Sequence, residues 1–322
     1  MISSSIQPGL YSLFPSYQAL GRFTDRTEKG LSAIGKKAGA QPTARPCRHN
    51  FIYEKDARYT IYSRICTSSI SSVFSAIEKD TGSCVVIKES IPSYQYIIKR
   101  EKGILARLRA CPSVVRCLNA EDSSADFLVL ELIDGCHLSR SLRLSLIEGL
   151  ILAYLLVEAF EQVHKNNIII RDVKDENIMI RRNGEIALID FGLAIDLKDS
   201  DDTINFLPNI GTIEFMPPEI CQPNPFLSKA IDYYSLGVVL YNLFSRTDLC
   251  GIRQHEHTNR FYSFTAHGEI LTDQCLGQVP ELLHPLLQAL IQRDPEKRVT
   301  DPEKLKEMIF QAILQHLEKT QA

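Results

Sequence analysis

The chain has 322 residues, of which 44% are hydrophobic and 23% are charged, and its formal net charge is −3 at pH 7. This length can hold one large domain or two of ordinary size, and the apolar fraction is sufficient for a core of that extent. The charge balance lacks the basic excess typical of proteins that follow nucleic-acid phosphates, so we expect no nucleic-acid partner. Small molecules and proteins are the partners that the composition favours.

The nine cysteines are scattered, and none are spaced C-x-x-C. Their odd number and their spacing argue against a disulfide framework and against a zinc site. They favour a reducing compartment such as the cytoplasm, and delivery into a host cell would fit equally well. The longest apolar stretch, residues 149–160, includes Glu158 and is too short to cross a bilayer, so we expect a buried helix and no membrane span. The oligomeric state stays unknown.

Residues 1–56 differ in composition from the rest of the chain. Between positions 22 and 48 there are seven lysines and arginines but only two acidic residues, with Ser, Gly and Pro interspersed. One interpretation is a poorly ordered leader. The other is a basic docking or targeting segment with one helix between Tyr17 and Lys37.

Short β-rich runs follow, and they predict strands over residues 59–66, 72–78 and 83–89, with a hairpin turn at residues 79–82. The apolar spacing of residues 96–109 predicts a helix, and residues 127–132 predict one more buried strand. From residue 138 onward the chain is mainly helical, except for a loop-rich stretch over residues 166–225. We predict an α+β fold with a small β-rich lobe (57–132) and a larger α-helical lobe (133–318), and ligands between them.

Two motifs carry recognisable chemistry. In the segment 170–177, Asp172 is followed two positions later by Lys174 and five positions later by Asn177, just before an expected strand over residues 178–182. Thirteen residues after Asn177 comes Asp190-Phe191-Gly192, behind the apolar run 186–189. This ordered pair resembles the catalytic loop and the metal-binding turn of eukaryotic-type serine/threonine protein kinases.

The resemblance extends over residues 57–318, because the family's other landmarks follow in order. They are Val85-Val86-Ile87-Lys88, Glu101 in the next helix, Gly211-Thr212 with Pro217-Pro218-Glu219, residues 232–237 and Arg298. In the family the late arginine pairs with the glutamate at the position of Glu219. Just beyond it, Thr300 to Glu303 has capping-box spacing and is expected to start the last helix.

The resemblance implies a bilobal protein-kinase-like fold that uses ATP and Mg²⁺ to phosphorylate a protein hydroxyl. Asp172 and Lys174 would be catalytic: Asp172 would orient the hydroxyl, and Lys174 would steady the γ-phosphate. Asn177 and Asp190 would hold the metal ions. The other implied nucleotide-binding residues are Lys88 with its partner Glu101, and Val73, Val86, Glu131 and Ile133.

Lys174 and Thr212 are the residue types that accompany Ser/Thr specificity in the family. The substrate consensus stays open, because Glu176 matches a position that contacts basic substrate residues, whereas His137 stands where a companion acid is usual. A further hypothesis is that Arg171 binds negative charge of the activation segment, which Asp199, Asp201 and Asp202 supply in place of a phosphate. The alternatives are a phosphate on Ser200 or Thr203 and a solvated acidic loop without contact to Arg171.

The glycine-rich loop of the family lacks its glycines here. Cys66, Ser68 and Ser71 occupy the three positions, and Ile170 replaces the usual histidine before Arg171. Forcing such residues into a left-handed conformation would cost about 1–2 kcal/mol each. These departures leave an alternative open, a pseudokinase that acts as a nucleotide-binding or scaffolding module.

Overall fold

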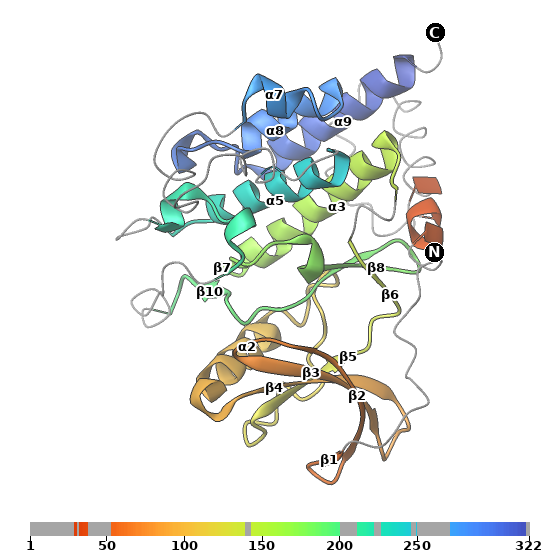
Figure 1. Ribbon diagram of the computed structural model, residues 1–322, viewed down its shortest axis with the longest axis vertical. Helices are drawn as coiled ribbons and strands as arrows, with labels where there is room; N and C mark the ends of the chain where they lie inside the picture. Colours follow the sequence, from red (N-terminus) through yellow and green to blue (C-terminus); the bar gives the residue numbers. More distant parts are fainter. Residues whose placement is uncertain are drawn as a thin grey trace.

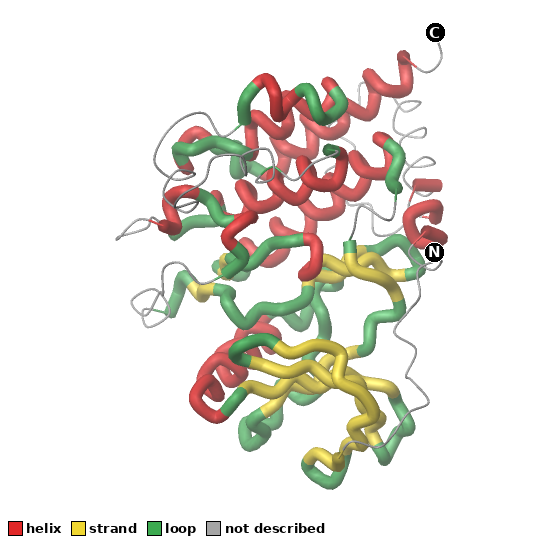
Figure 2. The backbone as a smooth tube through the Cα atoms, in the orientation of Figure 1, coloured by secondary structure: helices red, strands yellow, loops and turns green. Residues whose placement is uncertain are grey.

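The computed structural model describes residues 29–30, 32–37, 53–138, 143–199, 211–221, 227–245, 249 and 271–319. The chain forms a lobe built on one β-sheet and a second, mainly helical lobe (Figures 1 and 2). This arrangement confirms the predicted α+β, two-lobed fold. Residues 200–210 lie outside the described part, and they include Ser200, Asp201, Asp202 and Thr203, on which the hypothesis about Arg171 depends.

The N-terminal lobe holds a five-stranded antiparallel sheet in the order β1-β2-β3-β4-β5. The strands are β1 (Tyr53–Lys55), β2 (Tyr59–Thr67), β3 (Ser71–Glu78), β4 (Cys84–Ser90) and β5 (Phe127–Glu131). Buried residues alternate along β2, β3 and β4, as the period of two requires for a sheet with one covered face. The four expected strands are confirmed, and β1 adds a strand before the expected boundary at residue 57.

Helix α2 (Gln95–Arg107) packs against β4 and β5 and follows a 3₁₀ turn, η2 (Pro92–Tyr94). Ile98, Ile104 and Leu105 bury one side of the helix in the main hydrophobic core. Glu101, between them in sequence, is also buried. A carboxylate in that position needs a charged partner, and the partner is part of the candidate site described below.

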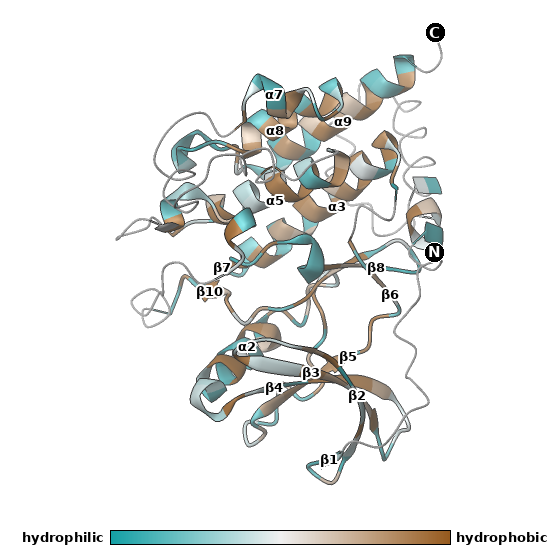
Figure 3. Cartoon of the chain, in the orientation of Figure 1, coloured by the Kyte–Doolittle hydropathy of each residue, from teal (hydrophilic) through white to brown (hydrophobic). Residues whose placement is uncertain are grey.

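The C-terminal lobe is built around two long apolar helices, α3 and α5, which are largely brown in Figure 3. Its helices are α3 (Leu146–Lys165), α5 (Ala230–Phe244), α7 (Asp273–Leu276), α8 (His284–Leu290) and α9 (Pro302–Lys319). The shorter 3₁₀ turns are η4 (Asp175–Asn177), η5 (Ile213–Phe215), η6 (Pro218–Cys221), η8 (Glu281–Leu283) and η9 (Pro295–Lys297). Residues 149–160 lie within α3, which confirms the expected buried helix.

Side chains cap the first turns of α3 and α9. Ser145 and Glu148 form a capping box at the start of α3. At α9 the expected start is confirmed, but Asp301 supplies the cap in place of Thr300, since its carboxylate accepts from the Glu303 amide at 3.0 Å. An aspartate serves as well as a threonine there, because either side chain can satisfy an unpaired amide of the first turn.

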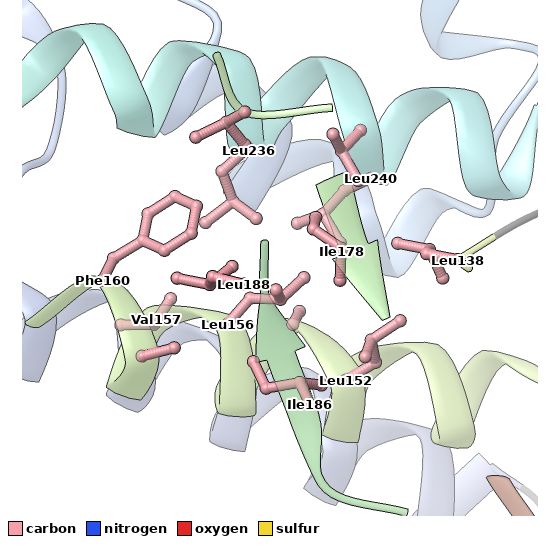
Figure 4. Packing of buried hydrophobic residues seen from close by; sticks show 14 of the residues in the cluster. Leu138, Leu152, Leu156, Val157, Phe160, Ile178, Ile186, Leu188, Leu236 and Leu240 are labelled. Atoms are coloured by element: carbon pink, nitrogen blue, oxygen red, sulfur yellow. The ribbon is translucent and has the colours of Figure 1, made fainter. Parts of the chain in front are cut away.

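Two small sheets line the C-terminal lobe where it faces the first lobe. One has the order β6-β8-β9, with β6 (Gly135–His137), β8 (Ile178–Arg181) and β9 (Ile186–Leu188), and the other pairs β7 (Ile168–Ile169) with β10 (Ile195–Asp196). Side chains of β8 and β9 interdigitate with those of α3 and α5 (Figure 4). This packing fixes two short loops, residues 170–174 between β7 and η4 and residues 189–194 between β9 and β10.

A short helical segment, described at residues 29–30 and 32–37 and called the N-terminal helix from here on, lies against the C-terminal lobe. It falls inside the interval in which a helix was expected. Among the described residues, no helix combines the length and hydropathy needed to cross a membrane. The six cysteines whose side chains are described are all free: Cys66, Cys84, Cys111, Cys117, Cys136 and Cys275.

Candidate active site

Lys88 joins the two lobes through a three-residue charge cluster. Its ammonium lies 3.0 and 2.8 Å from the two carboxylate oxygens of Glu101 on α2, and 2.8 Å from Asp190 Oδ1 in the second lobe. The side chains of Lys88 and Glu101 are 7% and 1% exposed, whereas that of Asp190 is 45% exposed. The cluster is therefore sealed on the side of α2 and open to solvent at Asp190.

The two carboxylates of this cluster hold Lys88 in its charged form. Burial alone would lower the pKa of Lys88, but the carboxylates of Glu101 and Asp190 outweigh it and raise that pKa above its usual value. The pKa of Asp190 falls despite the cost of its partial burial, because Lys88 donates to it, the Gly192 amide donates at 3.1 Å and Lys174 adds positive charge. At neutral pH the site thus presents one fixed cation beside an ionised carboxylate.

Helix α2 is held in place by contacts with the C-terminal lobe. Arg107 near its end forms an ion pair with Asp196 on β10 and donates to the Asn166 carbonyl at 2.5 Å. Arg100 donates to the carbonyl oxygen of Ala194. Because Glu101 lies on the same helix, these contacts restrain Glu101 relative to the C-terminal lobe, which carries Asp190.

Asp172 is surrounded by four donors. Its Oδ2 accepts from the Lys174 ammonium at 2.8 Å and from the Asn177 amide at 2.9 Å. Its Oδ1 accepts from the Thr212 hydroxyl at 3.1 Å and from the Thr212 backbone amide at 3.3 Å. The same hydroxyl lies 2.7 Å from the Lys174 ammonium, so Asp172, Lys174 and Thr212 form a closed triangle.

Two residues of these loops have an unusual backbone conformation. Arg171 has φ 69° and Asp190 has φ 66°, a region that non-glycine residues seldom adopt. Asp232 on α5 stabilises the first of them by accepting from the amides of Ile170 and Arg171, both at 2.8 Å. His164 lies 2.7 Å from the same carboxylate. The sequence identified Asp232 as a family landmark, but it gave no signal for His164.

The glycine-poor loop contains no left-handed residue. None of residues 66–72, all of which the structure describes, has a positive φ. Instead, the Ser68 hydroxyl accepts from the amides of Ile70 and Ser71 at 3.3 and 3.1 Å. Thr67 and Ser72 hydroxyls meet at 3.2 Å across the hairpin. The cost of about 1–2 kcal/mol per residue applies only to a loop that needs left-handed residues, so it does not arise here.

The remaining nucleotide-site candidates occupy two places. Val73 pairs with Lys88 in the register of β3 and β4, and Val86 lies two residues before Lys88 on β4. Paired residues and residues two apart share one face of a sheet, so Val73, Val86 and Lys88 face the same way. Glu131 ends β5 and Ile133, which is buried, follows in the connection between the lobes. The Glu131 carboxylate, however, bonds Arg181 at 2.7 and 3.2 Å.

Glu219 and Arg298 form the expected buried pair. The Arg298 guanidinium donates to both carboxylate oxygens of Glu219, in one case at 2.7 Å, and also to the Ala230 carbonyl at 3.1 Å. The guanidinium also lies over the ring of Tyr234, 4.8 Å from its centroid. Because Glu219 follows η5 and Arg298 follows η9, the pair ties the segment after Thr212 to the C-terminal helices.

Comparisons with known proteins agree with this geometry. The protein kinase domain family matches residues 59–316. The chain is 32% identical over 246 residues to "Serine/threonine protein kinase ypkA" of Aspergillus fumigatus, with 72% of this chain and 37% of that protein covered. It is 31% identical over 212 residues to human "Ribosomal protein S6 kinase alpha-4", with 62% of this chain and 26% of that protein covered.

A third relative, the "RAC family serine/threonine-protein kinase homolog" of Dictyostelium discoideum, is 27% identical over 276 residues, with 79% of this chain and 58% of that protein covered. The chain thus spans less than two thirds of the length of each of these relatives. The family match nevertheless includes both lobes and every landmark of the candidate site. The chain belongs to the eukaryotic-type serine/threonine protein kinase family.

Proposed function

We propose that the chain transfers the γ-phosphoryl group of ATP to serine or threonine hydroxyls of protein substrates. The observation that carries this proposal is the position of Lys88, which contacts Glu101 on α2 and Asp190 in the second lobe within 3.0 Å. Phosphoryl transfer requires mainly positioning and charge neutralisation, and this cluster supplies a fixed cation at the boundary between the lobes.

In this proposal Lys88 binds the α- and β-phosphates and Glu101 orients it. Val73 and Val86, on the same sheet face as Lys88, would contact the adenine ring. Glu131 and Ile133 would bind the adenine edge through backbone groups, because the Glu131 side chain is engaged by Arg181. An apolar surface with a few placed backbone donors and acceptors is typical of a nucleotide pocket.

Asp190 and Asn177 fit Mg²⁺ because both offer the oxygen ligands that this ion prefers. The Asn177 amide nitrogen donates to Asp172, so its carbonyl oxygen is the atom suited to a cation. When bound, the ion would neutralise phosphate charge. Lys88 and the Gly192 amide keep the Asp190 carboxylate oriented by bonding the same oxygen, Oδ1.

Asp172 would orient the substrate hydroxyl and accept its proton, and Lys174 would steady the charge on the γ-phosphate. Thr212 holds both side chains in place, and it also shows that an aliphatic hydroxyl fits beside Asp172 at 3.1 Å. This geometry supports serine and threonine as acceptors, as do the names of the relatives. The free cysteines support a reducing compartment such as the cytoplasm.

The proposal is tested by incubating the full chain with Mg²⁺, γ-labelled ATP and an array of serine, threonine and tyrosine peptides. We expect label on serine and threonine peptides, none when Mg²⁺ is chelated, and none with the Asp172→Asn variant. If the folded wild-type chain binds Mg·ATP but labels no peptide and not itself, the protein is a nucleotide-binding module and the proposal is wrong.

A further inference from the structure

The N-terminal helix lies outside the part of the chain that matches the kinase family, which begins at residue 59. Yet Ile34 on this helix is fully buried and belongs to the main hydrophobic core. The helix approaches α3 closely, because a Cβ added to Gly30 would lie 2.3 Å from Ile151 Cδ1. Only a residue without a side chain allows this contact as it stands.

The other glycine of the helix meets the turn between β8 and β9. A Cβ on Gly35 would lie 2.2 Å from the Arg182 carbonyl oxygen and 2.7 Å from the Gly184 amide nitrogen. Both atoms belong to backbone, which cannot move aside as the end of a side chain can. Gly35 therefore allows the helix to rest directly on the turn.

The end of the helix is fixed by charge. The Lys37 ammonium bonds the Glu148 carboxylate at 2.5 Å and the Arg143 carbonyl at 3.2 Å. Glu148 also closes the capping box of α3 with Ser145. Burial opposes ionisation of Glu148, but Lys37 and Ser145 outweigh it and lower the pKa of this carboxylate. The N-terminal helix thus contributes to the stability of the first turn of α3.

The turn between β8 and β9 also forms hydrogen bonds and ion pairs with the connection between the lobes. Arg181 contacts Glu131 at 2.7 Å. The Arg182 side chain contacts Asp134 Oδ1 at 2.7 Å, and the Arg182 amide donates to the Asp134 carbonyl at 3.0 Å. Continuous contacts therefore run from Gly35 through the turn to residues 131–134.

We propose that the N-terminal helix is an element of the catalytic domain that docks on the C-terminal lobe in cis and braces residues 131–134 through the β8–β9 turn. The helix restricts the turn, and the turn restricts the backbone beside Glu131 and Ile133. The part of this proposal that concerns nucleotide affinity rests on the proposed function, whereas the docking part does not.

The test uses the full chain with Ile34→Asp, which places a charge in the buried contact, and Ser32→Asp, which places the same charge on the exposed side of the same helix. Gly35→Ala is the milder second variant for the case in which Ile34→Asp fails to fold. Hydrogen–deuterium exchange is followed in residues 29–37, 131–135 and 181–185. Calorimetry measures the Kd of Mg·ADP.

We expect Ile34→Asp and Gly35→Ala to speed exchange in all three segments and to raise the Kd of Mg·ADP about fivefold or more, with Ser32→Asp unchanged. Unchanged exchange in residues 29–37 would overturn the docking. Faster exchange there without any change in residues 181–185 and 131–135 would overturn the bracing. Faster exchange in all three segments with an unchanged Kd would overturn the link between the helix and nucleotide affinity. A wild-type chain that does not bind Mg·ADP would refute the proposed function, but the exchange result would still test the docking and the bracing.

Discussion

Arg298 donates to both carboxylate oxygens of Glu219, and neither side chain is more than 5% exposed. Removing one partner leaves the other charged and buried, so Arg298→Met or Glu219→Leu alone should lower the free energy of unfolding by about 3–5 kcal/mol. The double variant should recover part of this loss, because no unpaired charge remains. Urea denaturation measures all three. Single variants within about 1 kcal/mol of wild type would contradict the buried pair.

Lys88→Met and Asp190→Asn should each reduce phosphotransfer at least a hundredfold, or about 2.7 kcal/mol of transition-state stabilisation. Lys88→Met also leaves the buried Glu101 without its cation and should lower the melting temperature, so activity is measured well below the melting point of each variant. Asp190→Asn, whose side chain is 45% exposed, should melt closer to the wild type. Lys79→Met is the matched control, because this lysine lies in an exposed hairpin turn and contacts only Glu54 among the ion pairs described. A variant that keeps more than about a tenth of the wild-type rate would refute its assigned role.

Thr212→Val should lower kcat for a serine peptide by about tenfold without changing KM for ATP, because valine keeps the shape but loses the hydroxyl that bonds Asp172 and Lys174. Thr212→Ser keeps the hydroxyl and should retain most of the activity. Steady-state kinetics with both substrates varied separates the two constants. Equal activity of the valine and serine variants would show that the Thr212 hydroxyl plays no part in the rate.

Glu158 should make stability depend on pH in the opposite sense to an ordinary salt-bridged carboxylate. Burial raises the pKa of Glu158 to about 7, with Glu161 and Glu303 adding to the shift and Lys306 opposing it. Since the folded pKa exceeds the unfolded value, the folded state binds more protons between about pH 4.5 and 7, and its stability falls as pH rises through this window.

Glu158→Gln removes this proton linkage. It should stabilise the protein by about 2–3 kcal/mol at pH 8 and by almost nothing at pH 4.5. Glu161→Gln is the control on the same helix, because Glu161 accepts from Lys165 and Lys306 and its pKa is lowered. That control should destabilise at pH 8. Thermal melts of the wild type and both variants at pH 4.5 and pH 8 measure these differences. If Glu158→Gln stabilises the protein equally at the two pH values, protonation of Glu158 is not linked to stability.

Much of the fold follows from local pattern. The alternation of buried residues in β2, β3 and β4 has the period of a half-covered sheet, and the expected strands agree closely with the observed ones. The spacing of Asp172, Lys174 and Asn177 and the sequence Asp190-Phe191-Gly192 led to the candidate site through their resemblance to the family. The structure places them in two short loops, and their roles stay predictions.

Other features could not be predicted because they depend on contacts between distant segments. The sequence does not show that Ser68 would bond loop amides in place of a left-handed glycine, since that depends on the conformation of the tip. Nor does it show that Arg181 would engage Glu131, fifty residues earlier. The capping box of Ser145 and Glu148, by contrast, is legible in the sequence and was overlooked.

The contact of Gly30 with Ile151 also bears on how the protein is produced. A recombinant domain begun at residue 57 or 59, where the family match starts, would lack Ile34 and would leave the apolar surface around Ile151 in water. Uncovered apolar surface of this kind favours self-association and poor yield. Expression boundaries placed before residue 29 should therefore give the monodisperse preparations that kinetics and crystallisation require.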